Sequence, residues 1–215
     1  MTGNTHWALG VAAGVCVAGY MGVQEDLVRT SLTIGAATVA ALLPDIDSKN
    51  SMLNRMLFQM IEAKWRSFSL GVLNLILALY YFIFDSPLWV LLLGIYVLAV
   101  NVAPHRGFTH SLFSLAAITW ITQMAAAEAY PELGVAVAVG YMTHLIADAV
   151  TVRGIPFLWP MKRNFGLKDL GVNVRTGSAI DLWTGRVALI LASGGWIWLI
   201  LHGWVRDTVA ATFFN

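Results

Sequence analysis

Seven apolar runs constrain this chain more than any other feature of its sequence. They cover roughly residues 8–23, 30–43, 68–84, 87–103, 111–127, 134–150 and 187–204. A helix needs about 20 apolar residues to cross the hydrocarbon core of a bilayer, so the shorter runs must borrow flanking residues, thin the bilayer or pack in a bundle that keeps their ends wet. All six prolines lie at or beyond run ends, as expected if proline cannot continue these helices. We therefore predict an all-α fold, a polytopic membrane helix bundle of about seven hydrophobic helices.

Composition supports one integral-membrane domain over residues 1–215. Hydrophobic residues make up 58% of the chain and charged residues only 12%, which is outside the range of soluble proteins. The expected partner is therefore the lipid bilayer, and the sequence leaves the oligomeric state open. The formal net charge of +1 gives no overall basicity that could drive tight binding to phosphate backbones, so no nucleic acid partner is expected. With Cys16 as its single cysteine, the chain forms no intramolecular disulfide.

Basic residues predict the orientation of the bundle. The segments 44–67, 104–110 and 151–186 hold eleven of the 13 Lys and Arg residues, and the alternation of seven spans places them on one side. The positive-inside rule makes that side cytoplasmic, together with the N-terminus. Within 44–67, helical spacing predicts an interfacial helix with Asn50 or Ser51 as its N-cap. Its apolar face is Leu53, Met56, Leu57, Met60 and Ile61, with Asn54, Arg55, Gln59 and Glu62 mostly opposite. The alternative is the start of the third span.

Residues 151–186 form the one long polar stretch of the chain. A polar segment of this length inside a compact domain favours a functional cap over a simple linker. We predict a cytoplasmic polar loop over the whole of 151–186.

Residues that can bind a metal gather on the same predicted side. They come from four separate segments and comprise His6, Asp45, Asp47, His105, His110, His144 and Asp148. His144 and Asp148 stand four residues apart and therefore share one face of a helix, where one cation can accept both. Ionisable residues inside a membrane are costly enough to suggest function. The convergence predicts a metal site at the cytoplasmic face.

Each motif also has a structural reading. His144 and Asp148 can tie two helices together through a polar contact. Asp45 and Asp47 can serve as a turn residue and a helix N-cap, and Thr109 or Ser111 can cap the following span. In the stretch from His105 to Ser111, however, capping does not explain two histidines beside Arg106, whose guanidinium suits an anion. His202 lies on the opposite side, and we interpret it as an interfacial residue.

These motifs resemble those of the YdjM-like family of LexA-regulated inner-membrane proteins, which are described as metal-dependent hydrolases. The resemblance rests on Thr5-His6-x-x-x-Gly10, Leu43-Pro44-Asp45-Ile46-Asp47, the His105 to Ser111 stretch, Gly140-Tyr141-x-x-His144-Leu145-x-Ala147-Asp148-x-x-Thr151-x-x-Gly154 and Leu158-Trp159-Pro160. It implies a bacterial cytoplasmic (inner) membrane location and a membrane-embedded metal hydrolase, distantly similar to zinc-dependent phospholipase C and P1-type nucleases. Gly177-Ser178-x-x-Asp181 resembles a family motif that usually ends in Glu, which leaves the role of Asp181 open.

Metal-assisted hydrolysis is the chemistry that we predict. The seven candidate ligands exceed what one four-coordinate zinc uses, so one or two ions are expected, zinc first and manganese or iron as alternatives. Asp45 or Asp47 would act as general base and Arg106 would hold the phosphoryl group, with Arg153, Lys162 or Arg163 binding further oxygens. At a bilayer boundary the natural substrate is a phosphate-containing amphiphile, such as a phospholipid or an isoprenoid phosphate.

Two other classes of function use the same ligands. A metal transporter or sensor would need ionisable groups near the midplane and open to both sides. A membrane scaffold stapled by metal, without catalysis, would need only four ligands. The sequence leaves both alternatives open.

Overall fold

The computed structural model describes residues 1–48, 51–57, 65–104, 106–161, 163–167 and 171–213. Within them the regular structure is helical, with no β-strand and only two isolated β-bridges. The helices are α1 (Gly3–Tyr20), α2 (Leu27–Leu42), α3 (Met52–Leu57), α4 (Arg66–Phe84), α5 (Leu88–Val102), α6 (Leu112–Ala126), α7 (Glu132–Ala149) and α8 (Ala179–Phe213). Two 3-10 turns, η1 (Leu43–Asp47) and η3 (Phe108–His110), complete them. The predicted all-α class is confirmed.

All seven apolar runs lie in helices, but not all of these helices are of membrane length. Among the described residues, three helical stretches are long and apolar enough to cross a membrane: Leu27–Ile46, Ser67–Phe84 and Ala179–His202. Helices α5 and α6 are apolar but have 15 residues each. A helix of that length measures about 22 Å, less than the roughly 30 Å of a hydrocarbon core. The count of seven complete spans stays a prediction.

Helices α1 and α8 begin at least five residues before their apolar runs. Helix α1 begins at Gly3, so His6 lies in its first turns rather than before it. Helix α8 begins at Ala179, where the Ser178 hydroxyl accepts a hydrogen bond from the Asp181 amide at 3.4 Å. The polar stretch therefore ends at residue 178, not 186. Polar residues in the first two turns of α8 conceal the helix start from a search for apolar runs.

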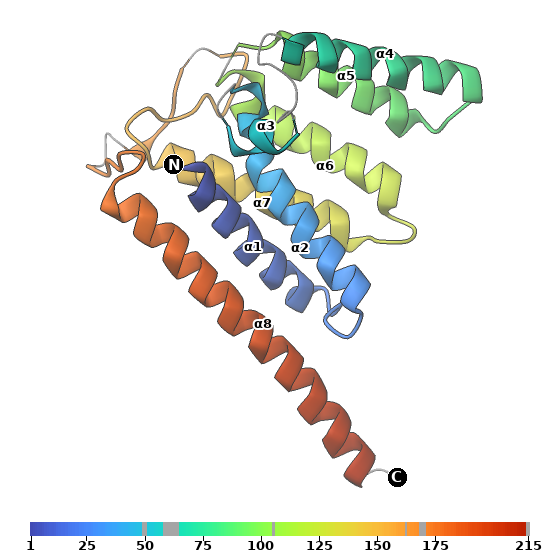
Figure 1. Ribbon diagram of the computed structural model, residues 1–215, viewed down its shortest axis with the longest axis vertical. Helices are drawn as coiled ribbons and strands as arrows, with labels where there is room; N and C mark the ends of the chain where they lie inside the picture. Colours follow the sequence, from blue (N-terminus) through green and yellow to red (C-terminus); the bar gives the residue numbers. More distant parts are fainter. Residues whose placement is uncertain (49–50, 58–64, 105, 162, 168–170, 214–215) are drawn as a thin grey trace.

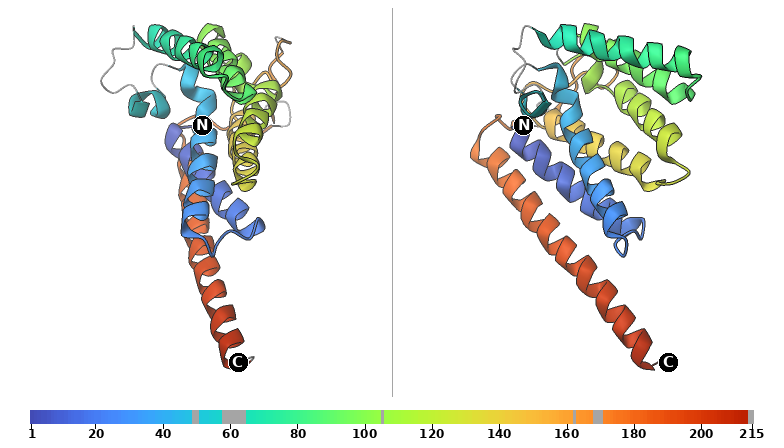
Figure 2. Two further views of the ribbon diagram at one scale, coloured as in Figure 1. Left: turned by 90° about the vertical axis from the view of Figure 1, so that its right-hand side faces the viewer. Right: turned by 45° about the vertical axis from the view of Figure 1, so that its right-hand side comes forward.

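The helices pack in an order that centres on α1, α2 and α7. Helix α1 contacts α2, α7 and α8, and α2 contacts α7. Helix α6 joins α7 to α5, and α4 packs on α5. In Figure 1, α4 and α5 form an antiparallel pair at one edge, while α8 follows α1 at the other. Both views of Figure 2 show α8 extending past the bundle to the C-terminus.

Glycines allow α1, α2 and α7 to approach closely. A Cβ on Gly10 would lie 2.7 Å from the Ala41 Cβ, and one on Gly140 would lie 2.1 Å from the Ala37 carbonyl oxygen. Neither approach is possible with a side chain, and small residues at helix crossings are typical of membrane bundles. Gly10 follows His6 by four residues and Gly140 precedes His144 by four. The two glycines therefore allow the histidine-bearing helices α1 and α7 each to pack closely against α2.

The described part of the segment between α2 and α4 consists of η1 and α3. Ser51 caps α3, because its hydroxyl accepts from the Asn54 amide at 3.1 Å, and Leu53 is buried as predicted. Asn54 differs from the prediction: it is buried, and its Nδ2 donates to the Ile46 carbonyl at 2.8 Å, closing the turn after η1. Met56 is instead exposed. Asn50, Gln59, Met60, Ile61 and Glu62 lie outside the described residues, and an interfacial position for this segment stays a prediction.

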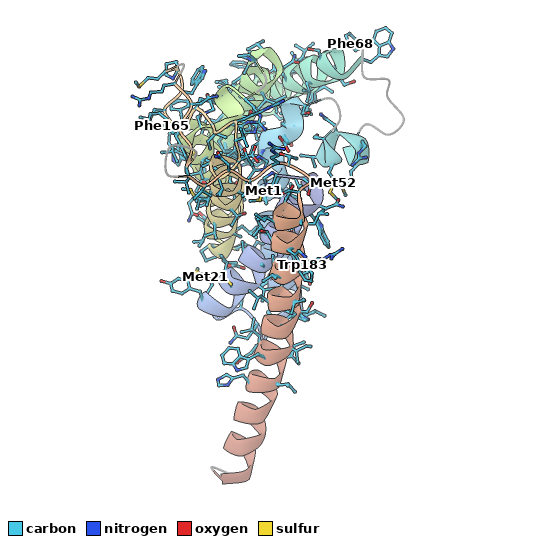
Figure 3. The ribbon with its side chains drawn as sticks, turned by 90° about the vertical axis from the view of Figure 1, so that its left-hand side faces the viewer. Met1, Met21, Met52, Phe68, Phe165 and Trp183 are labelled. Atoms are coloured by element: carbon cyan, nitrogen blue, oxygen red, sulfur yellow. The ribbon has the colours of Figure 1, made fainter. Side chains whose placement is uncertain are left out.

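After α7 the chain returns across the end of the bundle. Ile155 and Phe165 exchange two backbone hydrogen bonds of 2.9 and 2.8 Å, and Ile155 is fully buried against Tyr141 and Leu145. The Leu112 amide donates to the Phe157 carbonyl at 3.0 Å, which joins this segment to the start of α6. Figure 3 shows Phe165 in this segment, near the same end of the molecule as Met1. We call the described residues 151–161, 163–167 and 171–178 the cap, since their backbone contacts join them to the bundle.

Candidate metal centre

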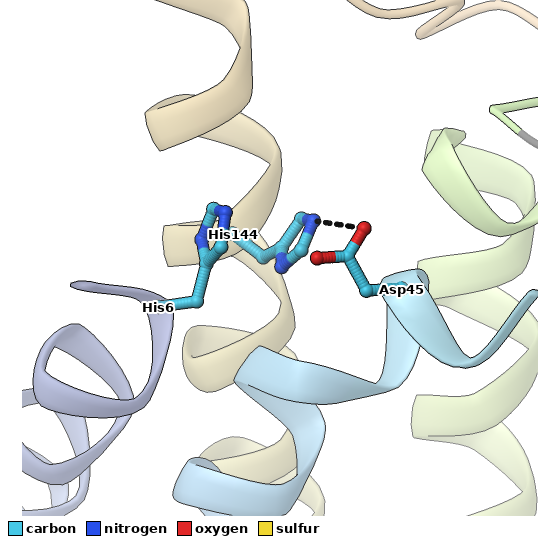
Figure 4. A group of neighbouring side chains, drawn as sticks. All are labelled: His6, Asp45 and His144. Atoms are coloured by element: carbon cyan, nitrogen blue, oxygen red, sulfur yellow. Dashed lines mark ion pairs between the residues drawn. The ribbon is translucent and has the colours of Figure 1, made fainter. Parts of the chain in front are cut away.

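Four segments of the chain meet at the capped end of the bundle. The start of α1 contributes His6, η1 contributes Asp45, η3 contributes His110, and the last turns of α7 contribute His144 and Asp148. These are five of the seven predicted metal ligands, and they span about 140 positions of the sequence. Figure 4 shows His6, Asp45 and His144 pointing toward one another from α1, η1 and α7.

The ligand atoms of this His–Asp cluster are closely spaced. His6 Nε2 lies 3.2 Å from Asp148 Oδ1, and the His110 and His144 Nε2 atoms lie 3.7 and 3.8 Å from Asp148 Oδ2. Asp45 Oδ1 lies 3.6 Å from His110 Nε2 and 3.9 Å from His144 Nε2. Ligand atoms about 2 Å from one tetrahedral ion lie about 3.3 Å apart. The cluster is therefore close to ligand spacing.

Packing fixes the orientation of the His144 ring. Its Nδ1 lies 2.7 Å from the Ala41 carbonyl oxygen, which can only accept a hydrogen bond. Nδ1 therefore carries the proton, and the lone pair of Nε2 faces the cluster. Helix α2 supplies that carbonyl through the close approach that Gly140 permits. A backbone partner of this kind commonly orients a histidine that binds a metal.

Two buried imidazoles lie face to face beside the carboxylates. The His6 and His144 rings stack with centroids 3.7 Å apart and planes 17° apart, and both residues are fully buried. Among the described residues, His144 Nε2 has no hydrogen-bond partner. A buried nitrogen without a partner is unfavourable, and a cation would accept its lone pair. The donor set therefore fits a divalent metal.

The cluster divides into two overlapping groups of three. One group is His6, Asp45 and His144, the other is His110, His144 and Asp148, and the ligand atoms in each lie within 4.8 Å of one another. His144 belongs to both. The Asp148 side chain is 2% exposed, whereas that of Asp45 is 25% exposed and reaches the edge of the site. This arrangement suits one ion with a mixed ligand set, or two adjacent ions that share His144.

A buried chain of hydroxyl groups holds the turn that carries His110. The Tyr141 hydroxyl donates to the Thr109 carbonyl at 2.5 Å and lies 2.8 Å from the Ser114 hydroxyl. Ser114 in turn lies 2.9 Å from the Tyr96 hydroxyl, so α5, α6 and α7 all support η3. No role for these hydroxyl groups was predicted from the sequence. Ser111 is the N-cap of α6, as one of the two alternatives predicted.

Arg106 lies against the cluster in an unusual backbone conformation. Its φ angle is +59°, in the left-handed region that side chains other than glycine rarely adopt. A guanidinium nitrogen lies 3.5 Å from Asp148 Oδ2. The neighbouring Gly107 is needed for a different reason, because a Cβ there would lie 2.8 Å from the Pro104 carbonyl oxygen. The turn thus directs Arg106 toward the carboxylate.

Asp181 anchors the beginning of α1 and is not part of the cluster. Its carboxylate accepts hydrogen bonds from the Thr5 hydroxyl at 2.6 Å, the Gly177 amide at 2.7 Å and the Thr2 amide at 3.0 Å. Asp181 is fully buried, and Thr5 directly precedes His6. This aspartate therefore holds α8, the end of the cap and α1 together next to a predicted ligand. The role that the sequence left open is positioning.

A cleft of about 500 Å³ lies beside the cluster. Its lining residues are Met1, Arg106, Thr151, Val152, Arg153, Val174, Arg175 and Thr176, and we call it the arginine cleft. The Met1 amino group and Arg106 both contact Asp148 from this side. Of the predicted substrate-binding residues, Arg106 and Arg153 line the cleft.

Other predicted residues are placed elsewhere or not described. Arg163 does not line the cleft, and its guanidinium lies over the Phe165 ring, 5.5 Å from the centroid. His202 stacks on Trp198 in α8, with centroids 4.9 Å apart, away from the cluster. His105 and Lys162 lie outside the described residues, as does the side chain of Asp47, whose backbone ends η1. Roles for these last three residues stay predictions.

Comparison with known proteins assigns the chain to a family. The family model for the YdjM inner membrane protein matches residues 1–211. The chain belongs to the YdjM inner membrane protein family. Its membrane location follows from the family together with the apolar helices. No solved structure matches the chain significantly.

Relatives of this YdjM family member occur in distant bacteria. The chain is 26% identical over 203 residues to "Uncharacterized protein YvsG" of Bacillus subtilis, covering 94% of this chain and 98% of that protein. It is 27% identical over 140 residues to "Inner membrane protein YdjM" of Escherichia coli, and likewise to the Shigella flexneri protein of that name. That alignment covers 64% of this chain and 54% of each relative, so the chain matches about half of their length.

Proposed function

We propose that this chain is a membrane-embedded, metal-dependent hydrolase that cleaves a phosphoester of a lipid or another amphiphile. The observation that carries the proposal is the convergence of three histidines and two aspartates from four segments at one buried point. An arginine that contacts Asp148 and also lines an open cleft supports it further. Metal ligands beside a cationic cleft are what hydrolysis of a phosphate ester requires.

His6, His110, His144 and Asp148 would hold the metal, zinc first and manganese or iron as alternatives. A bound divalent cation supplies water activation and neutralisation of the phosphoryl charge. Arg106 orients the phosphoryl oxygens, because its guanidinium lies between Asp148 and the cleft. Asp45 is the accessible carboxylate of the cluster, so its Oδ1 is placed to accept a proton from the attacking water.

An amphiphilic substrate fits the surroundings of the site. An apolar groove of about 570 Å³ lies between α1 and α8, lined by Leu9 and by residues from Ala179 to Leu191. The groove begins three residues after Thr176 of the arginine cleft. A lipid whose phosphate enters the cleft would therefore find an apolar surface for its chain beside it.

We further propose that the cluster and the cap face the cytoplasm, as the distribution of basic residues predicts. The test uses a Cys16→Ser background with one new cysteine, Asn173→Cys in the cap or Glu128→Cys at the other end of the bundle. An impermeant maleimide added to intact cells is expected to label the second variant and, only after permeabilisation, the first. Labelling of the cap cysteine in intact cells would invert the topology.

Catalysis is tested with the full chain purified in detergent. Phosphomonoester and phosphodiester lipids are offered with and without chelator, followed by zinc or manganese addition. We expect metal-dependent release of product, and Arg106→Gln is expected to lower turnover about 100-fold while retaining the metal. Arg163→Gln serves as the matched control, since Arg163 lies outside the cleft. A metal-loaded protein without turnover on either lipid class would instead favour a transporter, a sensor or a metal-stapled scaffold.

A further inference from the structure

Three arginines from different segments line the arginine cleft. Arg106 precedes η3, Arg153 follows α7, and Arg175 lies near the end of the cap. Arg175 was not among the residues singled out by the sequence, where twenty-two positions separate it from Arg153. Among the described residues, no acidic side chain lines the cleft. Cationic side chains gathered in this way repel one another unless an anion is bound between them.

Backbone pairing in the cap brings Arg153 and Arg175 together. Thr151 and Val174 form a parallel bridge, in which the Val152 amide donates to the Val174 carbonyl at 3.3 Å. The Val174 amide donates to the Val150 carbonyl at 3.2 Å, and Val174 itself is buried. Each arginine lies within two residues of this pairing. The cap therefore presents both guanidinium groups to one cleft as a consequence of its fold.

Among the described residues, no carboxylate neutralises the charges of Arg153 and Arg175. Neither guanidinium forms an ion pair with a carboxylate of the described residues, and both side chains are exposed. Arginine matches phosphate oxygens through paired N–H donors, which makes it the preferred residue for recognition of phosphate. Three guanidinium groups suit a phosphate with two negative charges better than one with a single charge.

The cleft is joined to the metal cluster through Asp148. Arg106 contacts its Oδ2 at 3.5 Å, and the Thr151 hydroxyl donates to its backbone carbonyl at 2.7 Å. Arg106 and Thr151 therefore both line the cleft and contact Asp148, the more buried carboxylate of the cluster. A phosphate bound by the arginines would lie beside the candidate metal ligands.

We propose that Arg106, Arg153 and Arg175 form a binding site for the dianionic phosphate of a phosphomonoester lipid. The inference deepens the proposed function and rests on it only for the claim that the bound phosphate is the group that reacts. Free inorganic phosphate shares the same chemistry, and the apolar groove that begins beyond Thr176 favours the lipid as its source.

Binding is measured with the full chain in detergent and with probes that cannot be hydrolysed. The first probe is dodecylphosphonate above its second pKa, the second is its monomethyl ester, which carries one charge, and the third is inorganic phosphate. Calorimetry gives each affinity, and the metal content of every sample is recorded. Because a carbon–phosphorus bond is not cleaved, the readout does not depend on hydrolysis, so the binding site and the proposed activity can fail separately.

Arg175→Gln and Arg153→Gln are each expected to weaken dodecylphosphonate binding about tenfold, the effect of losing one charge-assisted hydrogen-bonding partner. Arg163→Gln removes the same charge from the same cap and is expected to change affinity less than about twofold. Arg175→Lys keeps the positive charge but removes the paired N–H donors of the guanidinium. It is expected to show an intermediate loss of affinity and checks that the cap still folds. The metal content is expected to stay the same in all four variants.

Several results would overturn the inference. Equal losses in Arg163→Gln and Arg175→Gln would mean that general charge attraction, not the cleft, holds the phosphonate. No loss in either cleft variant would remove the site altogether. If the monomethyl ester bound as tightly as dodecylphosphonate, the site would have no preference for a phosphomonoester. If inorganic phosphate bound as tightly as dodecylphosphonate, the site would not be specific for a lipid.

Discussion

The two ends of the helix bundle bury charged groups in opposite ways. At the end away from the cap, Glu132 is fully buried and accepts two hydrogen bonds from Arg29, at 2.8 Å from Nε and 2.7 Å from Nη2. That pair is matched in charge and geometry. At the capped end, three buried histidines face two carboxylates, and the His144 Nε2 lone pair has no hydrogen-bond partner among the described residues.

The difference shows that burial of charge alone does not identify a functional site. Arg29 and Glu132 join α2 to α7 and satisfy each other, which is the behaviour of a structural contact. The His–Asp cluster has more nitrogen lone pairs than the surrounding protein satisfies, which is the behaviour of a site for a cation. Both groups of metal-ligating residues found in the described chain lie at this end. The candidate metal ligands of the described chain are therefore gathered at one end of the bundle.

The largest effect is expected from removing His144, the ligand shared by both groups of three. Structural zinc sites bind with about 10–16 kcal/mol, so the loss of one ligand in four is expected to weaken metal binding roughly 100-fold to 1,000-fold. Competition with a chromophoric chelator measures the affinity of His144→Ala, and membrane fractionation checks that insertion is unchanged. His202→Ala is the control and should keep the wild-type affinity. A wild-type affinity in His144→Ala would remove the cluster as the metal site.

At the other end of the bundle, we expect a substitution to lower the stability of the protein and to leave its metal content unchanged. Glu132→Gln leaves the Arg29 charge without its partner and is expected to lower the melting temperature by a few degrees. The loss is smaller than for a fully buried pair, because the Arg29 side chain is 34% exposed. Thermal unfolding in detergent measures the loss, while metal content should not change. If Glu132→Gln instead lost its metal, the two ends would not be independent.

Asp181 is also buried near the cluster, but its carboxylate is satisfied by hydrogen bonds. Asp181→Asn weakens the acceptors for Thr5 and Gly177 and loosens the helix turn that carries His6. Metal affinity is expected to fall about tenfold, the size typical of a residue that supports a ligand. Asp181→Glu tests the length of the side chain. An unchanged affinity in Asp181→Asn would show that the anchor does not reach the cluster.

Periodicity and position along the chain predicted much of this site. His6, Asp45 and His110 flank apolar runs on the same predicted side, and His144 and Asp148 lie near that end of the run 134–150, so helix ends alone bring the five residues together. His144 and Asp148 were paired by helical spacing within α7. Those inferences needed only the order of the apolar runs, because antiparallel helices with short connections return to the same end of a bundle.

Contacts made by irregular backbone were not predictable in the same way. Arg163 and Arg175 are both basic residues of the cap, and only the pairing of Thr151 with Val174 places Arg175 rather than Arg163 in the cleft. Asn54 was assigned to a polar face by spacing, but it closes a turn through the Ile46 carbonyl. Such positions depend on backbone hydrogen bonds between segments distant in sequence, which residue patterns do not encode.

Metal content shows whether the buried His–Asp cluster is a divalent metal site. The full chain is purified in detergent, loaded with zinc or manganese, dialysed and analysed by inductively coupled plasma mass spectrometry. The cluster predicts one or two ions per chain, removed by a chelator and restored by metal addition. If the loaded and folded protein retained less than about one ion in ten chains, the cluster would not be a divalent metal site.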